Sequence, residues 1–240
     1  MPDAVPAFVW VADLGEPEEQ VILAEDASHH VARVCRARLD DVLTLTDGRG
    51  GIARGHVERL SPRVEVRIDT VERRKRDSRH VLLCGAPEGQ RFDWLIEKLS
   101  ELGVARVRPI ECARRAWPRV AVRPDRWRRL ALAALQQSRG CYLLQIEAPT
   151  GLEEALSAES DATWGMLADP DGAAAGGIEW PAIGTTVAVV GPAEGLTDAE
   201  KTSVLSRGFV STSLAASRLR TETAALACAC RWAATRTSQD

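Results

Sequence analysis

The chain has 240 residues, of which 45% are hydrophobic and 27% charged, and its net charge is −3. This composition is ordinary for a globular protein, and the negative charge argues against a protein that coats nucleic acid indiscriminately. No apolar run approaches the roughly eighteen residues that a membrane span needs, and residues 1–3 lack a basic signal segment. We therefore expect a cytoplasmic protein.

Residues 5–70 predict a small β-barrel with one helical insertion. Short strands are expected at residues 7–11, 42–46, 51–57 and 64–68, with a hairpin turn at 47–50. A helix is expected at 27–35, begun by Asp26 or Ser28. Arg33 and Arg36 would lie on one face of it, where they could touch a phosphate or face only solvent. The charged segment 72–77 marks a boundary, so we expect domains at 1–72 and 73–240.

Residues 73–240 alternate between strand and helix patterns, which predicts a mainly parallel sheet. Strands are expected at residues 81–85, 104–110, 163–168, 185–190 and 209–214. Helices are expected at residues 90–102, 126–138, 150–160, 197–207 and from 224 onward. Gly103 should end the first helix and Thr197 should begin the fourth. Residues 171–177 are expected to form a flexible loop.

Positive charge is concentrated between Arg106 and Arg139, where ten arginines accompany only two acidic residues. Such a segment favours contacts with the phosphates of a nucleic acid. Trp117 could stack on a base, although a packed indole is the more common outcome.

The six cysteines fit no disulfide or zinc pattern, and cysteine is among the most often buried residues, so buried free thiols are expected. The pair His29-His30 has no third ligand at a useful spacing, and we expect no metal site.

Two loops near the end of the chain predict a ligand site. The apolar strand 185–190 stops at Gly191-Pro192, and the polar loop 220–223 runs into a helix of small residues. Ligands of α/β sheets bind where strand ends open into loops, so the two loops suit a cofactor. Small residues there let the backbone approach a ligand closely.

These loops resemble the signature motifs of the SPOUT methyltransferases, and specifically the RsmE type. The second motif, 219–224, is reproduced closely. In the first, Ala193 and Glu194 stand where the family usually has Glu and Gly, and Ala215 replaces a loop glycine. An added Cβ at 194 or 215 would force a changed loop if φ is positive there. Segments 29–48, 88–104 and 124–139 are also similar to the family, in the same order. Arg114 matches a family arginine whose neighbours differ here, at Ala113 and Arg115.

The resemblance implies a SPOUT trefoil-knot α/β domain after a PUA-like β-barrel that binds RNA. It implies a homodimer that uses S-adenosylmethionine to methylate N3 of a uridine in small-subunit rRNA, either free or in the assembled 30S subunit. The cofactor-binding residues that it implies are Leu167, Gly191, Pro192, Ala193, Glu194, Gly195, Leu214, Ala215, Leu219, Arg220 and Thr223. The RNA-binding residues that we expect are Arg33, Arg36, Arg114, Arg115, Arg126 and Arg139.

Removal of the N3 proton leaves negative charge on the uracil oxygens, and Arg220 is the candidate that stabilises it. Glu222 could orient Arg220 or accept the proton. A simpler alternative is that Thr221 or Thr223 caps the last helix and Glu222 complements its dipole.

Three other functions stay open. One is an RNA-binding protein on the same fold whose reaction is lost or weakened, which the altered first motif motivates. Another is a SPOUT enzyme with a different RNA substrate. The last is a generic nucleotide-binding α/β enzyme, which ranks lowest because the chain has neither a Gly-x-Gly-x-x-Gly after a strand nor a P-loop.

Overall fold

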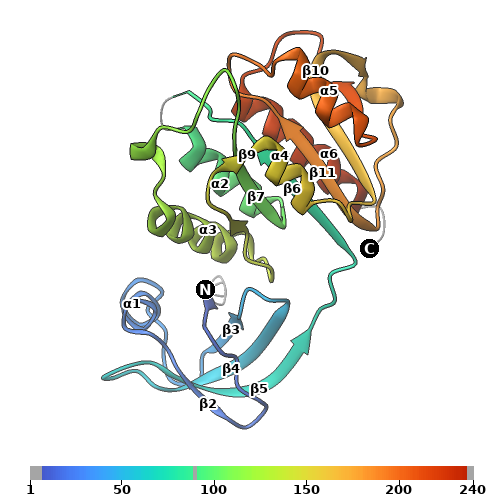
Figure 1. The fold of residues 1–240 in the computed structure, drawn as a ribbon. Coiled ribbons are helices and arrows are strands. Elements are labelled where there is room, and N and C mark those ends of the chain that lie inside the picture. Colours follow the sequence, from blue (N-terminus) through green and yellow to red (C-terminus); the bar gives the residue numbers. More distant parts are fainter. Residues whose placement is uncertain (1–6, 89–90, 237–240) are drawn as a thin grey trace. The chain divides into compact units, whose positions relative to one another are not determined.

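The computed structural model describes residues 7–88 and 91–236 (Figure 1). Contacts divide the chain into two units. The first runs up to Arg76 and includes Leu135–Leu143, and the second contains Asp77–Ala134 and the chain from Leu144 onward. No helix within the described ranges combines the length and the apolar character that crossing a membrane would require.

The first unit is a five-stranded sheet in the order β1-β3-β4-β5-β2. Its strands are β1 (Phe8–Trp10), β2 (Gln20–Ile22), β3 (Val42–Thr46), β4 (Gly51–Arg59) and β5 (Glu65–Arg73). All neighbours are antiparallel except β1 and β3, which are parallel. The predicted strands and the turn at 47–50 are confirmed. The Asp47 carboxylate closes this turn by accepting hydrogen bonds from the backbone of Arg49 and Gly51.

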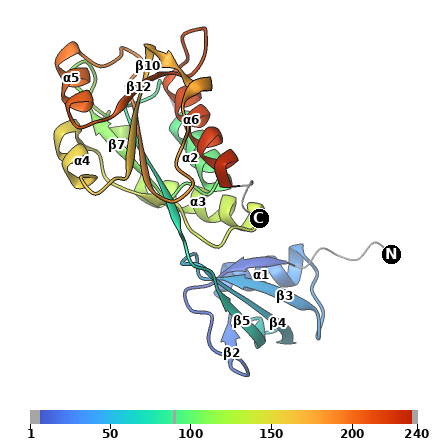
Figure 2. The ribbon, with the colours of Figure 1, turned by 90° about the vertical axis from the view of Figure 1, so that its right-hand side faces the viewer.

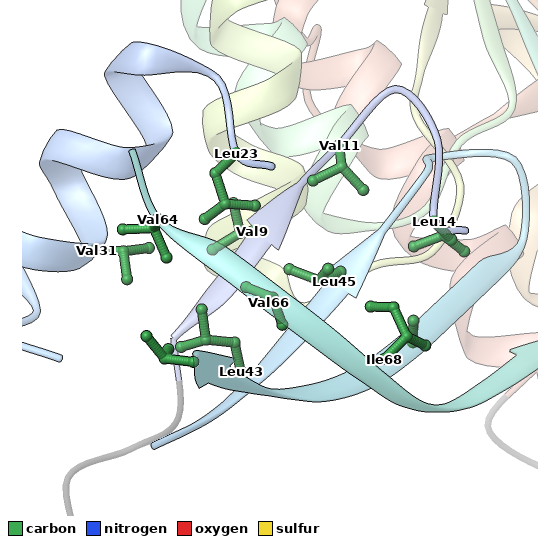
Figure 3. Close-up of a cluster of buried hydrophobic side chains, with 12 residues drawn as sticks. Val9, Val11, Leu14, Leu23, Val31, Leu43, Leu45, Val64, Val66 and Ile68 are labelled. Atoms are coloured by element: carbon green, nitrogen blue, oxygen red, sulfur yellow. The ribbon is translucent and has the colours of Figure 1, made fainter. Parts of the chain in front are cut away.

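Alternating strand residues build the core of this unit, because successive side chains point to opposite faces of a sheet. Leu43 and Leu45 of β3 are buried together with Val66 and Ile68 of β5, and Val31 of the helical insertion packs on them. Figure 3 shows these side chains converging on one face of the curled sheet.

The helical insertion differs from the prediction at both ends. It consists of α1 (Glu25–His29) and a π-helical turn (His30–Val34), so neither Asp26 nor Ser28 precedes it as a cap. Ser28 is buried instead, and its hydroxyl donates to Leu23 and accepts from the backbone of Val64. Arg36 lies beyond the helical turn with φ +55°, so it does not share a helix face with Arg33.

The second unit is built on a parallel sheet in the order β12-β10-β11-β6-β7-β8, with β9 paired to β7. Its strands are β6 (Ser78–Cys84), β7 (Arg106–Glu111), β8 (Gln145–Ile146), β9 (Thr150–Gly151), β10 (Trp164–Ala174), β11 (Gly184–Val190) and β12 (Val210–Ser213). The mainly parallel sheet is therefore confirmed. The short strands β2, β8 and β9 were not predicted.

Helices cover both faces of this sheet. They are α2 (Arg91–Glu101), α3 (Pro124–Ser138), α4 (Leu152–Ala158), α5 (Asp198–Ser206) and α6 (Thr221–Arg236), with short 3₁₀ turns at Arg119–Ala121 and Ala175–Gly177. Figure 2 shows α4 and α5 on one face and α2 and α6 on the other. Thr197 caps α5 through a capping box with Glu200, and Gly103 follows α2 with φ +71°, both as predicted. The expected first residue of α2, Gln90, lies outside the described residues.

Two expectations for this unit are wrong. Residues 171–174 continue β10, and Ala173 and Ala174 pair with β12 after a register shift, so this segment is not a flexible loop. Thr221 is already the first residue of α6, so the polar segment 220–223 is mostly the first helical turn.

The cysteine prediction holds only in part. Cys84, Cys112 and Cys228 are buried free thiols, as expected. Cys35 and Cys230 are exposed.

Candidate active site

The carboxyl ends of three neighbouring parallel strands, β10, β11 and β12, open into one cavity of about 370 Å³. We call it the strand-end cavity. The predicted cofactor residues that line it are Leu167, Gly191, Pro192, Ala193, Glu194, Gly195, Leu214, Ala215 and Leu219. Because β10 lies between β11 and β12, segments far apart in the sequence meet here, as is usual for ligand sites of parallel sheets.

The loop after β11 is held in place by donors from other segments. The Thr221 hydroxyl at the start of α6 donates to the Gly191 carbonyl (3.1 Å). The Arg218 guanidinium donates to the carbonyl of Ala193 (2.9 Å), and Arg114 donates to that of Glu194 (3.0 Å). Three carbonyls of this loop are therefore occupied, which fixes the shape of the loop before a ligand binds.

Two of the residues that depart from the family pattern contact each other. The Arg115 guanidinium lies 2.6 Å from the Glu194 carboxylate. The pKa of the Glu194 carboxyl is lowered, mainly by a hydrogen bond from the backbone N–H of Glu194 and to a smaller extent by Arg115. The positive φ of this loop falls on Gly195 (+77°), while neither Glu194 nor Ala215 is among the described residues with positive φ. The added Cβ atoms therefore do not force the left-handed backbone that would strain them.

Four charged residues of the strand-end cavity were missed from the sequence, namely Asp169, Asp171, Lys201 and Arg218. Asp169 and Lys201 form an ion pair of 2.9 Å. Asp169 directly follows the predicted strand 163–168, so its place at a strand end could have identified it. The bulge that carries it requires Gly172, where an added Cβ would lie 2.4 Å from the backbone nitrogen of Thr212.

A second hollow of about 330 Å³ adjoins the cavity and shares Ala193, Arg218, Leu219 and Thr221 with it. Arg220 and Glu222 line this adjoining hollow rather than the cavity itself. Arg220 is exposed and forms no ion pair within the described part of the chain. Its guanidinium is therefore available to a ligand.

Glu222 does not hold Arg220, contrary to one expectation. It is 6% exposed and forms an ion pair with Arg91 at the start of α2. Thr223 is exposed and lines neither hollow, so the structure does not bring it to the predicted cofactor site. Thr221 lies there instead.

The arginine-rich segment divides into structural and exposed groups. Arg106 and Arg108 sit on alternate positions of β7 and pair with Glu159, whose side chain is 3% exposed. Burial raises the pKa of the Glu159 carboxyl against the lowering effect of these two arginines. These two arginines therefore stabilise the fold and are not phosphate contacts.

The expected RNA-binding arginines are dispersed. Arg114 and Arg115 lie beside the strand-end cavity, whereas Arg126 is exposed on α3 and pairs with Asp93. In the first unit, Arg33, Arg36 and Arg139 are exposed.

Trp117 is buried against Phe92 and Trp127, so it packs and does not stack on a base. Among the described residues, no group of three or more His, Cys, Asp or Glu side chains is placed to hold a metal ion.

Comparison with known families agrees with this architecture. Residues 74–233 match the family model of the RNA methyltransferase domain, and residues 23–69 match that of the RNA methyltransferase PUA domain. The chain therefore belongs to the RNA methyltransferase family. The predicted α/β domain with a mainly parallel sheet, preceded by a PUA-like domain, is confirmed.

The names of individual relatives are more specific than the descriptions of the two family models. The chain is 28% identical to the ribosomal RNA small subunit methyltransferase E of Synechocystis sp., over 91% of this chain and 76% of that protein. It is 25% identical to the enzyme of the same name from Bacillus subtilis, over 82% of this chain and 83% of that protein. A solved structure of the Neisseria gonorrhoeae enzyme, bound to S-adenosylmethionine, has a TM-score of 0.79 at 25% identity and covers 95% and 96% of the two chains.

Proposed function

We propose that the protein transfers a methyl group from S-adenosylmethionine to N3 of a uridine in small-subunit ribosomal RNA, the family target written m3U1498. The observation that carries the proposal is the pair of adjoining hollows, which share four residues. One hollow offers the small residues and backbone groups that suit an adenosine cofactor. The other offers a free guanidinium at the place where a flipped base would meet the methyl group.

In this proposal the cofactor occupies the strand-end cavity. Leu167, Leu214 and Leu219 supply apolar surface for the adenine ring, while the loop 191–195 supplies backbone groups. The interactions that hold Gly191, Ala193 and Glu194 keep this loop preorganised, so little ordering cost accompanies binding. The solved relative from Neisseria gonorrhoeae, which holds S-adenosylmethionine, supports this assignment.

The uracil would occupy the adjoining hollow, with Arg220 beside its oxygens. The sulfonium is already a good leaving group, so the protein needs mainly to align donor and acceptor and to stabilise the anionic base. Arg220 provides a fixed positive charge for that purpose. Glu222, which Arg91 holds in an ion pair, would line the site and is a candidate acceptor of the N3 proton.

We assign the RNA contacts to both predicted domains. Residues 1–72 would act as the RNA-binding PUA-like domain and 73–240 as the methyltransferase domain. Arg33, Arg36 and Arg139 in the first unit and Arg126 in the second are exposed and could contact phosphates. We further propose that the enzyme is a homodimer and acts in the cytoplasm on the rRNA or the assembled 30S subunit. Light scattering on the purified protein tests the dimer.

Calorimetric titration with S-adenosylmethionine tests the cofactor half of the proposal. We expect binding in the micromolar range, as is typical of enzyme ligands. A folded protein that binds no cofactor, with or without added ribosomal RNA, would contradict the proposal and favour an RNA-binding protein that lacks the reaction. Arg220→Ala should leave this binding intact and abolish methylation.

The altered first motif was the reason to consider such an inactive protein. The structure weakens that reason, because the positive φ of the loop lies at Gly195, which the chain retains. The ion pair between Glu194 and Arg115 also gives the replaced residues a role in holding the loop. We therefore favour the active enzyme.

A further inference from the structure

Asp169 occupies a special place at the end of β10. The parallel pairing of β10 with β11 runs to Ala168, opposite Val190, and the register with β12 shifts immediately afterwards. A bulge of this kind re-aims a side chain, and such irregularities are frequent beside active sites. The side chain of Asp169 lines the strand-end cavity although the residue is only 7% exposed.

The two oxygens of this carboxylate are used unequally. Oδ1 accepts hydrogen bonds from Lys201 Nζ (2.9 Å) and from the backbone nitrogen of Asp171 (3.2 Å). Oδ2 has no partner within the described part of the chain, and it is not sealed from solvent. Water in the cavity can donate to this oxygen, so a ligand that fills the cavity and displaces the water is expected to supply a donor in its place.

The charge balance indicates which kind of donor fits. Lys201 already neutralises Asp169, so the pair has little net attraction for a second cation such as the α-ammonium of the methionine moiety. A neutral hydroxyl does not depend on the net charge of the pair, and it forms a strong hydrogen bond with a carboxylate. An adenosine cofactor carries two adjacent hydroxyls on its ribose. The apolar part of the lining, formed by Leu167, Leu214 and Leu219, is left for the adenine ring.

We propose that Asp169, held in place by Lys201, accepts the ribose hydroxyls of the cofactor and thereby selects ribonucleoside ligands. This inference rests on the proposed function, because it takes the strand-end cavity to be the cofactor site. It assigns a specificity role to two residues that lie outside both signature motifs.

Calorimetry with modified ligands tests the assignment. The ligands are S-adenosylhomocysteine, its 2′-deoxy and 3′-deoxy analogues, and 5′-methylthioadenosine, which lacks the amino-acid part. The proteins are the wild type, Asp169→Ala, and Asp161→Ala as a control, since Asp161 is an exposed carboxylate of the same unit that does not line the cavity. Thermal unfolding confirms that each variant is folded.

For the wild type we expect at least one deoxy analogue to bind roughly 10- to 100-fold more weakly than S-adenosylhomocysteine, the usual effect of losing a hydrogen bond to a charged group. Asp169→Ala should weaken S-adenosylhomocysteine and 5′-methylthioadenosine by a similar factor. It should bind the deoxy analogue no worse than S-adenosylhomocysteine. Asp161→Ala should behave like the wild type. Lys201→Met keeps the Asp169 carboxylate but removes the ammonium group that holds it in place. This variant should therefore lose part of the discrimination against the deoxy analogues.

Two results would overturn the assignment. If Asp169→Ala still discriminates against the deoxy analogues as strongly as the wild type, the hydroxyls bind elsewhere. If it weakens S-adenosylhomocysteine but leaves 5′-methylthioadenosine unchanged, the carboxylate receives the ammonium group. Failure of the wild type to bind any of these ligands would instead overturn the proposed function, and the assignment with it.

Discussion

The hydrogen bond between the Thr221 hydroxyl and the Gly191 carbonyl gives a quantitative prediction. It joins the first residue of α6 to the loop after β11, and Thr221 is 4% exposed. Thr221→Val keeps the shape of the side chain but leaves this carbonyl without its donor. The bond is partly buried, and losing a bond of this kind costs about 0.5–1.5 kcal/mol, which corresponds to roughly 1–6 °C in melting temperature for a chain of this size. Affinity for S-adenosylmethionine should also fall, because the loop lines the strand-end cavity.

The chain offers a matched control for this experiment. The Thr202 hydroxyl donates to the Asp198 carbonyl (2.8 Å), but Thr202 is exposed on α5 and water can replace the missing donor. Thr202→Val should therefore change stability by no more than about 0.5 kcal/mol, and Thr221→Ser should retain wild-type binding. Differential scanning calorimetry and cofactor titration measure both effects. Equal stability and equal affinity for Thr221→Val and Thr202→Val would refute the idea that this bond holds the loop.

Three further predictions concern charge, pH and thiol reactivity. Reversing Arg126 and Arg129 to Glu should lower the slope of log affinity for RNA against log salt by roughly 0.7–0.9 for each phosphate that the variant no longer neutralises, and an unchanged slope in anisotropy titrations would place the RNA elsewhere. Burial lowers the pKa of His80 from an ordinary 6.5 to about 3, so the contribution of His80 to stability should be constant between pH 6.5 and about 8. It should fall below pH 6.5 as the unfolded chain takes up a proton, by about 2 kcal/mol at pH 5. His80→Gln should lack this loss in urea titrations, and the same pH dependence in both proteins would contradict the assignment. A thiol reagent should label Cys35 and Cys230 in the folded protein, whereas the three buried cysteines should react only on unfolding; equal rates for all six would show that the core opens.

The sequence identified the framework of the site because its signals are local. The apolar run of β11 ends at Gly191-Pro192, and the capping residue Thr197 follows within the same short stretch. Both features depend only on neighbouring residues. The same holds for the alternating strands of the first unit.

Composition misled where a segment of small residues was taken for a flexible loop. Position 172 is a glycine because its backbone passes directly against that of β12, and no side chain fits between them. At this position a small residue is required by packing and does not indicate flexibility. The linear excess of arginine misled in a similar way, because Arg106 and Arg108 share one face of β7 and meet the buried carboxylate of Glu159 there.

Ion pairs between residues far apart in the chain could not be predicted from the sequence. Glu222 and Arg91 are 131 residues apart, and their ion pair replaces the expected contact between Glu222 and Arg220. The pairing of Glu194 with Arg115 likewise joins two departures from the family pattern that the sequence presents as unrelated. Only the sheet order brings such residues together.

The most direct test of the proposed function is to incubate the protein with S-adenosylmethionine and unmethylated small-subunit RNA or 30S subunits, and to analyse the nucleosides by mass spectrometry. The wild type should produce 3-methyluridine, located at one position by fragment mapping. Arg220→Ala should bind the cofactor and the RNA with near wild-type affinity but yield none. A methylated product other than 3-methyluridine, no product from a protein that binds both ligands, or full turnover by Arg220→Ala would contradict the account.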